Sequence, residues 1–158
     1  MLLMLCLVLL DELPEGWVKH DASAEGFTIT MPKPEHRKRT ETDGDGNPAT
    51  LSMYQGKSEK RQFIVSVTDF ADSYLAQSPK TIFDRGCDAS LSRSGGTLVS
   101  EKDIQLNAHP GREMTVSVKQ YGFLRVSAYL INKRQYSLLM LVEKQEQLDD
   151  AVARRFFD

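Results

Sequence analysis

Apolar and polar residues alternate along much of the C-terminal half of the chain. From Met114 to Val118 every second side chain is apolar and the side chains between are polar. This period of two is typical of a β-strand with one buried face. We therefore predict a strand at residues 111–119, a tight turn at residues 121–122 and a second strand at residues 123–131.

The pattern changes after a polar hairpin loop at residues 132–134. Alternate positions from Tyr136 to Val142 are apolar, and Leu139 and Leu141 make the opposite face apolar as well. A strand that is apolar on both faces is covered on both sides of its sheet. Residues 136–142 are thus predicted to lie near the middle of the sheet.

Shorter segments of strand character fill the rest of the chain. Proline ends one of them at Pro32, because proline cannot donate to a strand ladder. An Asp-Gly sequence at residues 43–47 predicts a hairpin turn. The predicted strands are residues 13–19, 27–31, 51–54 and 63–70, followed by either two strands at 98–102 and 104–106 or one bent strand.

A helix is predicted at residues 79–93. Ser78 is a suitable N-cap, apolar residues recur every fourth position from Phe83 to Leu91, and Gly95 follows as a stop signal. The four-residue spacing places the apolar side chains on one stripe that packs against a sheet.

A second helix is predicted at residues 149–158, where Val152 and Phe156 continue an apolar stripe that begins at Leu148. Strands, a helix, a strand meander and a last helix follow one another along the chain. This order predicts an α+β domain in which helices flank an antiparallel β-sheet.

Composition limits the number of domains and the class of partner. The chain has 158 residues, of which 41% are hydrophobic, and this suits a single domain at residues 11–158. Its net charge of -2 gives no electrostatic reason for nucleic-acid binding. The basic residues 37–39 are flanked by acidic residues, and we interpret them as a solvated strand edge.

Residues 1–10 are apolar without interruption. Ten helical residues span about 15 Å, half of a hydrocarbon core of about 30 Å, so this segment does not cross a membrane alone. It lacks a basic start and a cleavage site, and we favour a truncated secretory signal or anchor over a buried N-terminal element. An extracytoplasmic or membrane-tethered location follows, with a cytoplasmic location as the alternative.

No catalytic constellation can be assembled from the sequence. Cys87 lies on the apolar stripe of the predicted helix without an assignable base, and it is predicted to be buried and inert. The loop at residues 43–47 starts like a calcium loop, but Pro48 and Tyr54 stand where glycine and glutamate are required. We predict no catalytic residue, cofactor or metal site, and no enzyme activity.

Several of these features resemble the PsbP-like superfamily. They are Trp17 in the opening segment, the strand that ends at Pro32, the helix after Ser78, the sequence HPGREMTV and the final ARRFFD. This superfamily includes the PsbP subunit of photosystem II, a Ran-binding nuclear import factor and uncharacterised bacterial exported proteins. The resemblance implies an α/β/α sandwich and a non-enzymatic scaffold that binds protein partners.

The sequence therefore predicts an interaction or scaffold domain whose partner and oligomeric state it does not identify. The alternative is a small-ligand carrier with a cleft between sheet and helix, for which Tyr121, Tyr129 and Tyr136 are candidate lining residues. Possible contacts to a ligand or partner are Arg112, Tyr121 and Tyr129. Arg112 and Glu113 are adjacent on a strand, so they are predicted to point to opposite faces.

Overall fold

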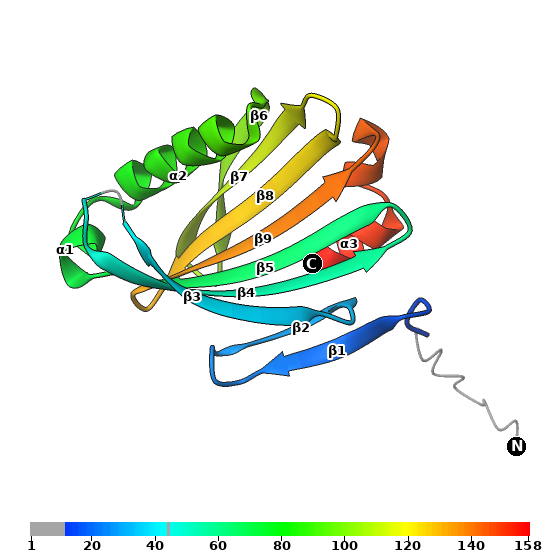
Figure 1. The fold of residues 1–158 in the computed structure, drawn as a ribbon, viewed down its shortest axis with the longest axis horizontal. Coiled ribbons are helices and arrows are strands. Elements are labelled where there is room, and N and C mark those ends of the chain that lie inside the picture. The colour runs from blue at the N-terminus through cyan, green and yellow to red at the C-terminus, as the bar shows by residue number, and fades with distance from the viewer. Residues whose placement is uncertain (1–11, 44) are drawn as a thin grey trace, which may run out of the picture.

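A seven-stranded antiparallel sheet and a two-stranded hairpin make up most of the computed structural model, which describes residues 12–43 and 45–158 (Figure 1). The strands are β1 (Trp17–Ala22), β2 (Phe27–Pro32), β3 (Glu35–Thr42), β4 (Pro48–Ser58), β5 (Arg61–Asp69), β6 (Thr97–Leu106), β7 (His109–Val118), β8 (Gly122–Ile131) and β9 (Arg134–Val142). The helices are α1 (Asp72–Leu75), α2 (Pro79–Ser94), the 3-10 helix η1 (Gln145–Leu148) and α3 (Ala151–Phe157).

The strand order in the large sheet is β3-β4-β5-β9-β8-β7-β6. The central position of β9 confirms the prediction made from its two apolar faces. Its neighbours are β5 and β8, and both pairings are antiparallel, with Phe63 opposite Met140 and Val126 opposite Leu139. Strands β3 and β6 are the outermost strands in this order and form the two free edges of the sheet.

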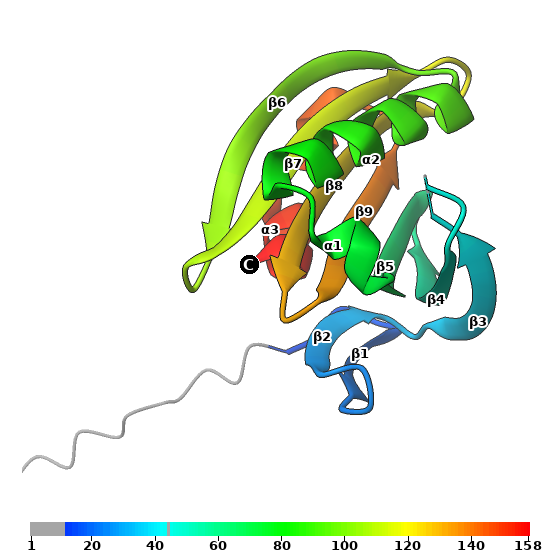
Figure 2. The same ribbon diagram turned by 90° about the vertical axis from the view of Figure 1, so that its left-hand side faces the viewer.

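The two faces of the large sheet are covered differently. Helix α2 crosses one face, which we call the helix face (Figure 2). The hairpin β1–β2, together with η1 and α3, packs on the other, which we call the hairpin face. Side chains alternate between these faces along the strands of the large sheet, and the buried side chains form two separate cores.

The larger core lies on the hairpin face. Trp17 from β1 meets Phe63 from β5 edge to face with ring centroids 5.1 Å apart, and Phe156 from α3 meets the same ring at 5.1 Å. Met31 and Met140 are fully buried beside them. Aromatic pairs of this geometry add stability beyond their buried area. The ring of Phe63 therefore contacts both the hairpin and α3.

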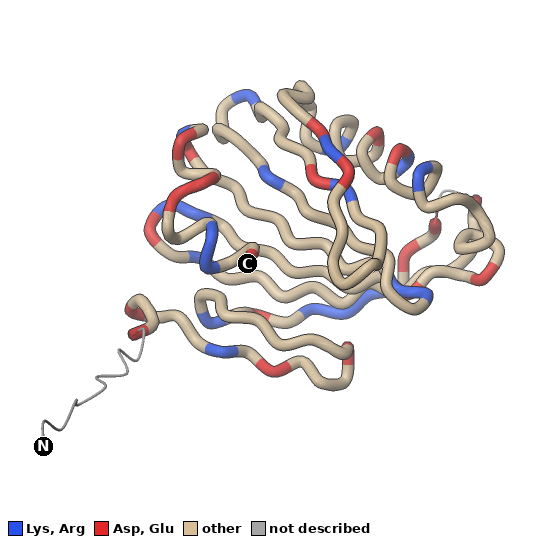
Figure 3. Tube along the Cα trace, turned by 180° about the vertical axis from the view of Figure 1, so that it is seen from behind, with Lys and Arg blue, Asp and Glu red and all other residues tan. Residues whose placement is uncertain are grey.

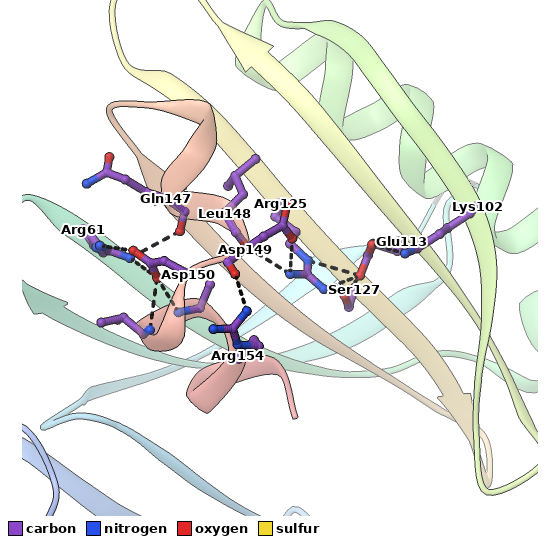
Figure 4. Close-up of polar contacts among 12 residues, drawn as sticks. Arg61, Lys102, Glu113, Arg125, Ser127, Gln147, Leu148, Asp149, Asp150 and Arg154 are labelled. Carbon is purple, nitrogen blue, oxygen red and sulfur yellow. Dashed lines mark hydrogen bonds and ion pairs between the residues drawn. The ribbon is translucent and has the colours of Figure 1, made fainter.

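Polar contacts also hold the C-terminal segment against the hairpin face (Figure 4). Arg61 donates two hydrogen bonds to Asp150, at 2.9 and 2.6 Å, and Asp150 in turn accepts from the backbone N–H groups of Val152 and Ala153. Arg125 donates to the carbonyl oxygen of Leu148 at 3.0 Å. The start of α3 is thus fixed by two arginines of the sheet.

The predicted helix at residues 79–93 is confirmed and ends one residue later. Ser78 Oγ accepts a hydrogen bond from the Thr81 N–H at 3.2 Å, and Gly95 adopts the left-handed conformation with φ of 59°. Both caps are those that the sequence indicated. The buried stripe of α2 packs on a smaller core formed by Met114, Val116, Val118 and Val126.

The predicted α/β/α sandwich is wrong. Strands account for 54% of the structure and helices for 21%, and the helices are few and short. A strand hairpin and the seven-residue helix α3 cover much of the hairpin face, where a sandwich has a helical layer. The fold is mostly antiparallel β, so both the α+β class and the sandwich implied by the PsbP-like resemblance are replaced by this architecture.

Several predicted boundaries also change. The strand expected at residues 13–19 runs from Trp17 to Ala22, because Gly16 adopts a φ of 78° in a turn just before it. Residues 98–106 form one strand with a register shift between Leu98 and Ser100, which decides between the two alternatives. The C-terminal helix predicted at residues 149–158 is α3 (Ala151–Phe157), and the 3-10 helix η1 precedes it.

The apolar segment at residues 1–10, interpreted above as a signal or anchor, lies outside the described residues. Within residues 12–43 and 45–158, no helix has the length and apolar character needed to cross a membrane.

Candidate functional site

A cleft of about 440 Å³ lies between α2 and the helix face of the sheet. Helix α2 packs above β7, near one edge of the sheet (Figures 1 and 2). The central strands β4, β5, β9 and β8 also contribute lining residues, and these strands form the floor of the cleft. The cleft thus arises because one helix is too narrow to cover a seven-stranded sheet.

The floor has an apolar part. Its members are half-buried or buried side chains that alternate with the hairpin-face core along their strands: Leu51, Met53, Ile64, Met114, Val126 and Leu139. Ile64 and Leu139 are directly opposite each other on β5 and β9. Half-buried aliphatic side chains at the centre of a sheet offer contact area to an apolar ligand.

A polar stripe adjoins this apolar part on the same two strands. Ser66 is opposite Ser137, and Thr68 is opposite Gln135. Gln135 Nε2 donates a hydrogen bond to Ser137 Oγ at 3.2 Å. The stripe gives the floor hydroxyl and amide groups beside its aliphatic groups, so the cleft surface is amphipathic.

The roof of the cleft is α2, and it contains a glycine in its interior. Ile82, Phe83 and Cys87 are buried against the sheet, while Gly86 lines the cleft. A Cβ atom added to Gly86 would meet no heavy atom within 4 Å outside the local helix backbone. Glycine inside a helix costs about 0.5–1 kcal/mol relative to alanine. Because Gly86 has no side chain, the space above the floor of the cleft stays open.

Helix α1 and the loop between β3 and β4 form one end of the cleft. Arg85 on α2 pairs with Asp45 at 2.9 Å and lies over the ring of Tyr74 at 5.9 Å. Asp43 Oδ1 accepts from the backbone N–H groups of Asp45 and Asn47, both at 2.9 Å. The predicted hairpin turn at residues 43–47 is confirmed. The carboxylate of Asp43 closes the turn, and the carboxylate of Asp45 attaches it to α2 through Arg85.

Cys87 is buried, with 8% of its surface exposed, as predicted. Its Sγ lies 3.3 Å from Sδ of Met114. Burial raises the pKa of the Cys87 thiol, and the carboxylate of Glu101 raises it further. The thiolate is therefore disfavoured, and Cys87 acts as a small apolar group between helix and sheet.

Arg112 also borders the cleft, but its guanidinium is occupied by three carboxylates. Its Nε donates to Asp103 at 2.7 Å, and its Nη1 lies 3.2 Å from Glu101 and 3.3 Å from Asp84. The side chain is only 11% exposed. Asp84 is on α2 and the other two carboxylates are on β6, so Arg112 joins the helix to the edge of the sheet.

Arg93 lies near the C-terminal end of α2 and also lines the cleft. It is exposed, and none of the acidic side chains in the described residues forms an ion pair with it. Arg39, across the cleft on β3, is paired with Glu41. Arg93 is accordingly the lining arginine whose charge is left for a bound anion.

The candidate residues predicted from the sequence do not meet in one place. Arg112 borders the cleft, whereas Tyr121 is 65% exposed in the turn between β7 and β8. Tyr129 and Tyr136 are opposite each other on β8 and β9, on the hairpin face. Tyr136 donates a hydrogen bond to the carbonyl oxygen of Glu25 at 2.8 Å. These tyrosines therefore do not line the predicted cleft.

Glu113 lies on the hairpin face, which confirms that it and Arg112 point in opposite directions. It accepts from Arg125 at 2.8 Å and pairs with Lys102 at 2.9 Å (Figure 4). Burial alone would raise its pKa, but the hydrogen bonds from Lys102 and Arg125 hold the pKa below its usual value. This cluster is separate from the cleft.

Sequence reasoning missed Gly86 and the serines of the floor. The available signals were a glycine within the helical period and the mixed face of β5, where Ile64, Ser66 and Thr68 follow one another. A face that combines aliphatic side chains with a few polar ones matches the lining that is usual for small-molecule pockets.

Among residues 12–43 and 45–158, no group of three or more histidine, cysteine, aspartate or glutamate side chains is arranged to hold a metal ion. No family model matches the sequence, and no curated protein matches it significantly.

Proposed function

We propose that this protein is a non-enzymatic binding domain that holds a small amphipathic ligand in the cleft between α2 and the sheet. The sequence offered this function as the alternative to a scaffold. The volume of about 440 Å³ lies within the range of about 300–1,000 Å³ that is usual for small-molecule sites.

The observation that carries the proposal is Gly86. Any larger residue except proline in the middle of α2 would stabilise the helix and would project into the cleft. The space around Gly86 is free, so packing against the sheet does not require glycine there. A binding site that must stay open for a ligand would require glycine at position 86.

The lining indicates the chemical class of the ligand. The aliphatic floor suits an apolar body, and the stripe of Ser66, Ser137 and Gln135 suits a polar group along one side of that body. Arg93 adds a positive charge that none of the described acidic side chains pairs with. We therefore propose an apolar molecule that carries one anionic group.

The test uses 1-anilinonaphthalene-8-sulfonate, an aromatic anion whose fluorescence rises in apolar sites. We expect saturable binding by the full chain. Gly86→Phe should weaken this binding at least about tenfold, because the ring fills the cleft. Asp88→Phe, which adds the same ring to an exposed position of α2, is the matched control and should leave the affinity within about twofold.

A second comparison separates charge from apolar contact. Arg93→Gln should weaken binding of the sulfonate but leave binding of the uncharged probe N-phenyl-1-naphthylamine unchanged. Circular dichroism and a melting curve establish that each variant is folded. Equal affinities of Gly86→Phe and Asp88→Phe for both probes would show that the cleft is not the binding site.

The scaffold function and the extracytoplasmic or tethered location inferred from the sequence stay predictions. The apolar segment on which the location depends lies outside the described residues.

A further inference from the structure

Strand β6 is a free edge of the sheet with an unusual surface. It is ten residues long, hydrogen-bonded to β7 within the large sheet, and bowed away from the body of the molecule (Figure 2). Every residue of β6 except Ile104 is exposed. Among the described residues five large hydrophobic side chains are exposed, and three of these are Leu98, Val99 and Leu106 of β6.

The opposite edge differs. Strand β3 carries the successive basic residues Arg37, Lys38 and Arg39, which are visible as a run of positive charge (Figure 3). Such charges prevent an edge strand from pairing with another copy. On β6 the charges are restricted to residues 101–103, and a register shift before Ser100 interrupts the strand. The part from Lys102 to Leu106 is regular and ends in apolar Leu106.

The register with β7 fixes which face each β6 side chain occupies. Asp103 is opposite Arg112, so Asp103 and Gln105 lie on the helix face. Ile104 is opposite Gly111, so Lys102, Ile104 and Leu106 lie on the hairpin face. The hairpin face of this edge is therefore mainly apolar near its end, and the helix face is polar.

We propose that β6 pairs antiparallel with β6 of a second copy of this chain, about a two-fold axis that passes between the two Ile104 residues. A two-fold axis perpendicular to the sheet keeps each side chain on its own face, so a residue can only oppose one whose number differs from its own by an even amount. This condition leaves few registers for the regular part of the strand.

Charge selects among those registers. An axis at Glu101, Lys102 or Asp103 places that residue opposite its own copy, and the axis at Lys102 also places Glu101 opposite Asp103. Like charges directly opposite each other destabilise a strand pair. An axis at Ile104 avoids all of these pairs and keeps residues 102–106 paired, whereas an axis at Gln105 would leave only residues 104–106 paired within the strand.

The register at Ile104 also creates favourable pairs. Asp103 comes opposite Gln105 of the second copy, whose amide can donate to the carboxylate. Lys102 comes opposite Leu106, where its aliphatic stem covers the leucine while its ammonium keeps its ion pair with Glu113. The two Ile104 side chains meet at the centre. The exposed apolar end of β6 is thus buried by its own copy, and the two seven-stranded sheets become continuous.

Disulfide linkage between introduced cysteines tests directly which β6 residues lie opposite each other in the dimer. In a Cys6→Ser background, Ile104→Cys should form a covalent dimer under mild oxidation, because opposed strand residues lie about 4.5–5.5 Å apart at their Cβ atoms. Lys102→Cys is the matched control on the same strand and face. Its two copies would lie about 14 Å apart along and across the strands and should not link.

Linkage at Lys102→Cys without linkage at Ile104→Cys would overturn the register, and failure of both to link would overturn the pairing. If the chains associate through another surface, neither cysteine variant should link.

Sedimentation of the unmodified full chain should show a dimer, and Leu106→Lys should raise its dissociation constant at least about tenfold. Val99→Lys, before the register shift, should leave it unchanged within about twofold. Equal dissociation constants for these two variants would contradict the proposal.

Discussion

The ring of Tyr129 occupies the space that a side chain at Gly111 would need. A Cβ atom at Gly111 would lie 2.6 Å from Cδ1 of Tyr129 and 2.7 Å from the carbonyl oxygen of Ala128. Ile104 of β6 is on the other side, 3.0 Å from that position. A glycine on β7 thus lets an aromatic residue of β8 approach the edge strand β6, and the three strands pack as one unit.

Replacing Gly111 by alanine should therefore destabilise the protein by about 1–3 kcal/mol, the usual cost of overpacking. Urea unfolding of the two proteins measures the loss. Adding Tyr129→Ala should recover only part of it, because the Ala128 carbonyl oxygen remains in place. Full recovery in the double variant would mean that the ring alone accounts for the glycine.

Asp150 is expected to be the most sensitive carboxylate of the C-terminal segment. Asp150→Ala removes the N-cap of α3 and leaves Arg61 unpaired, with its side chain 9% exposed. We expect a loss of about 3–5 kcal/mol in chemical denaturation. The neighbouring Asp149→Ala is the control. Asp149 is 86% exposed in its pair with Arg125, and its loss should cost less than about 1 kcal/mol.

The same ion pair predicts an acid dependence of stability. The hydrogen bonds from Arg61 lower the pKa of Asp150 in the folded state. A carboxyl whose folded pKa is depressed stabilises the fold above its unfolded pKa of about 3.9, and this contribution is lost as the pH falls through the folded pKa. The stability difference between the unmodified protein and Asp150→Asn should be constant from pH 7 to about 5 and shrink below about pH 4. A difference that persists unchanged to pH 2 would rule out this linkage.

Two glycines of the α2 region should respond to alanine in opposite directions. Gly86→Ala fills open space in the helix interior and should stabilise the protein by about 1 kcal/mol. Gly95→Ala should destabilise it by about 1–2 kcal/mol, because Gly95 has a φ of 59° at the C-cap. Melting temperatures of the two variants provide the comparison. A stability loss in Gly86→Ala would show that the space above the floor is smaller than described.

Phe156 should be the residue of α3 on which docking depends. It is 2% exposed and meets the Phe63 ring. Phe156→Ala should cost about 3–5 kcal/mol, the usual range for a buried phenylalanine. Phe157→Ala removes a half-buried ring that lies 4.2 Å from the guanidinium of Arg125, and it should cost less. Similar losses in both variants, measured by denaturant unfolding, would mean that α3 docks through both rings equally.

Much of the local structure could be predicted from the sequence because the forces that decide it act over a few residues. The alternation from Met114 to Val118 identified a strand, and the two apolar faces of residues 136–142 identified the centre of the sheet. Ser78 and Gly95 marked the ends of α2 because capping depends on neighbouring backbone groups.

The sequence alone did not show which layer covers the second face of the sheet. Apolar residues at Trp17 and Met31 fit a helix layer or a hairpin equally well at the level of pattern, since both bury the same kind of side chain. Their contacts with Phe63 and Phe156 joined segments far apart in the sequence and replaced the expected sandwich with a β-rich architecture.

The cleft was likewise decided by tertiary structure. The sequence placed tyrosines in a cleft between sheet and helix, but the side-chain alternation of β8 and β9 directed Tyr129 and Tyr136 to the hairpin face. Alternation determined that Ile64, Ser66 and Ser137 share a face with their neighbours, whereas the position of α2 over β7 determined that this face stays partly open. A strand's own sequence defines its two faces, and only packing decides what each face meets.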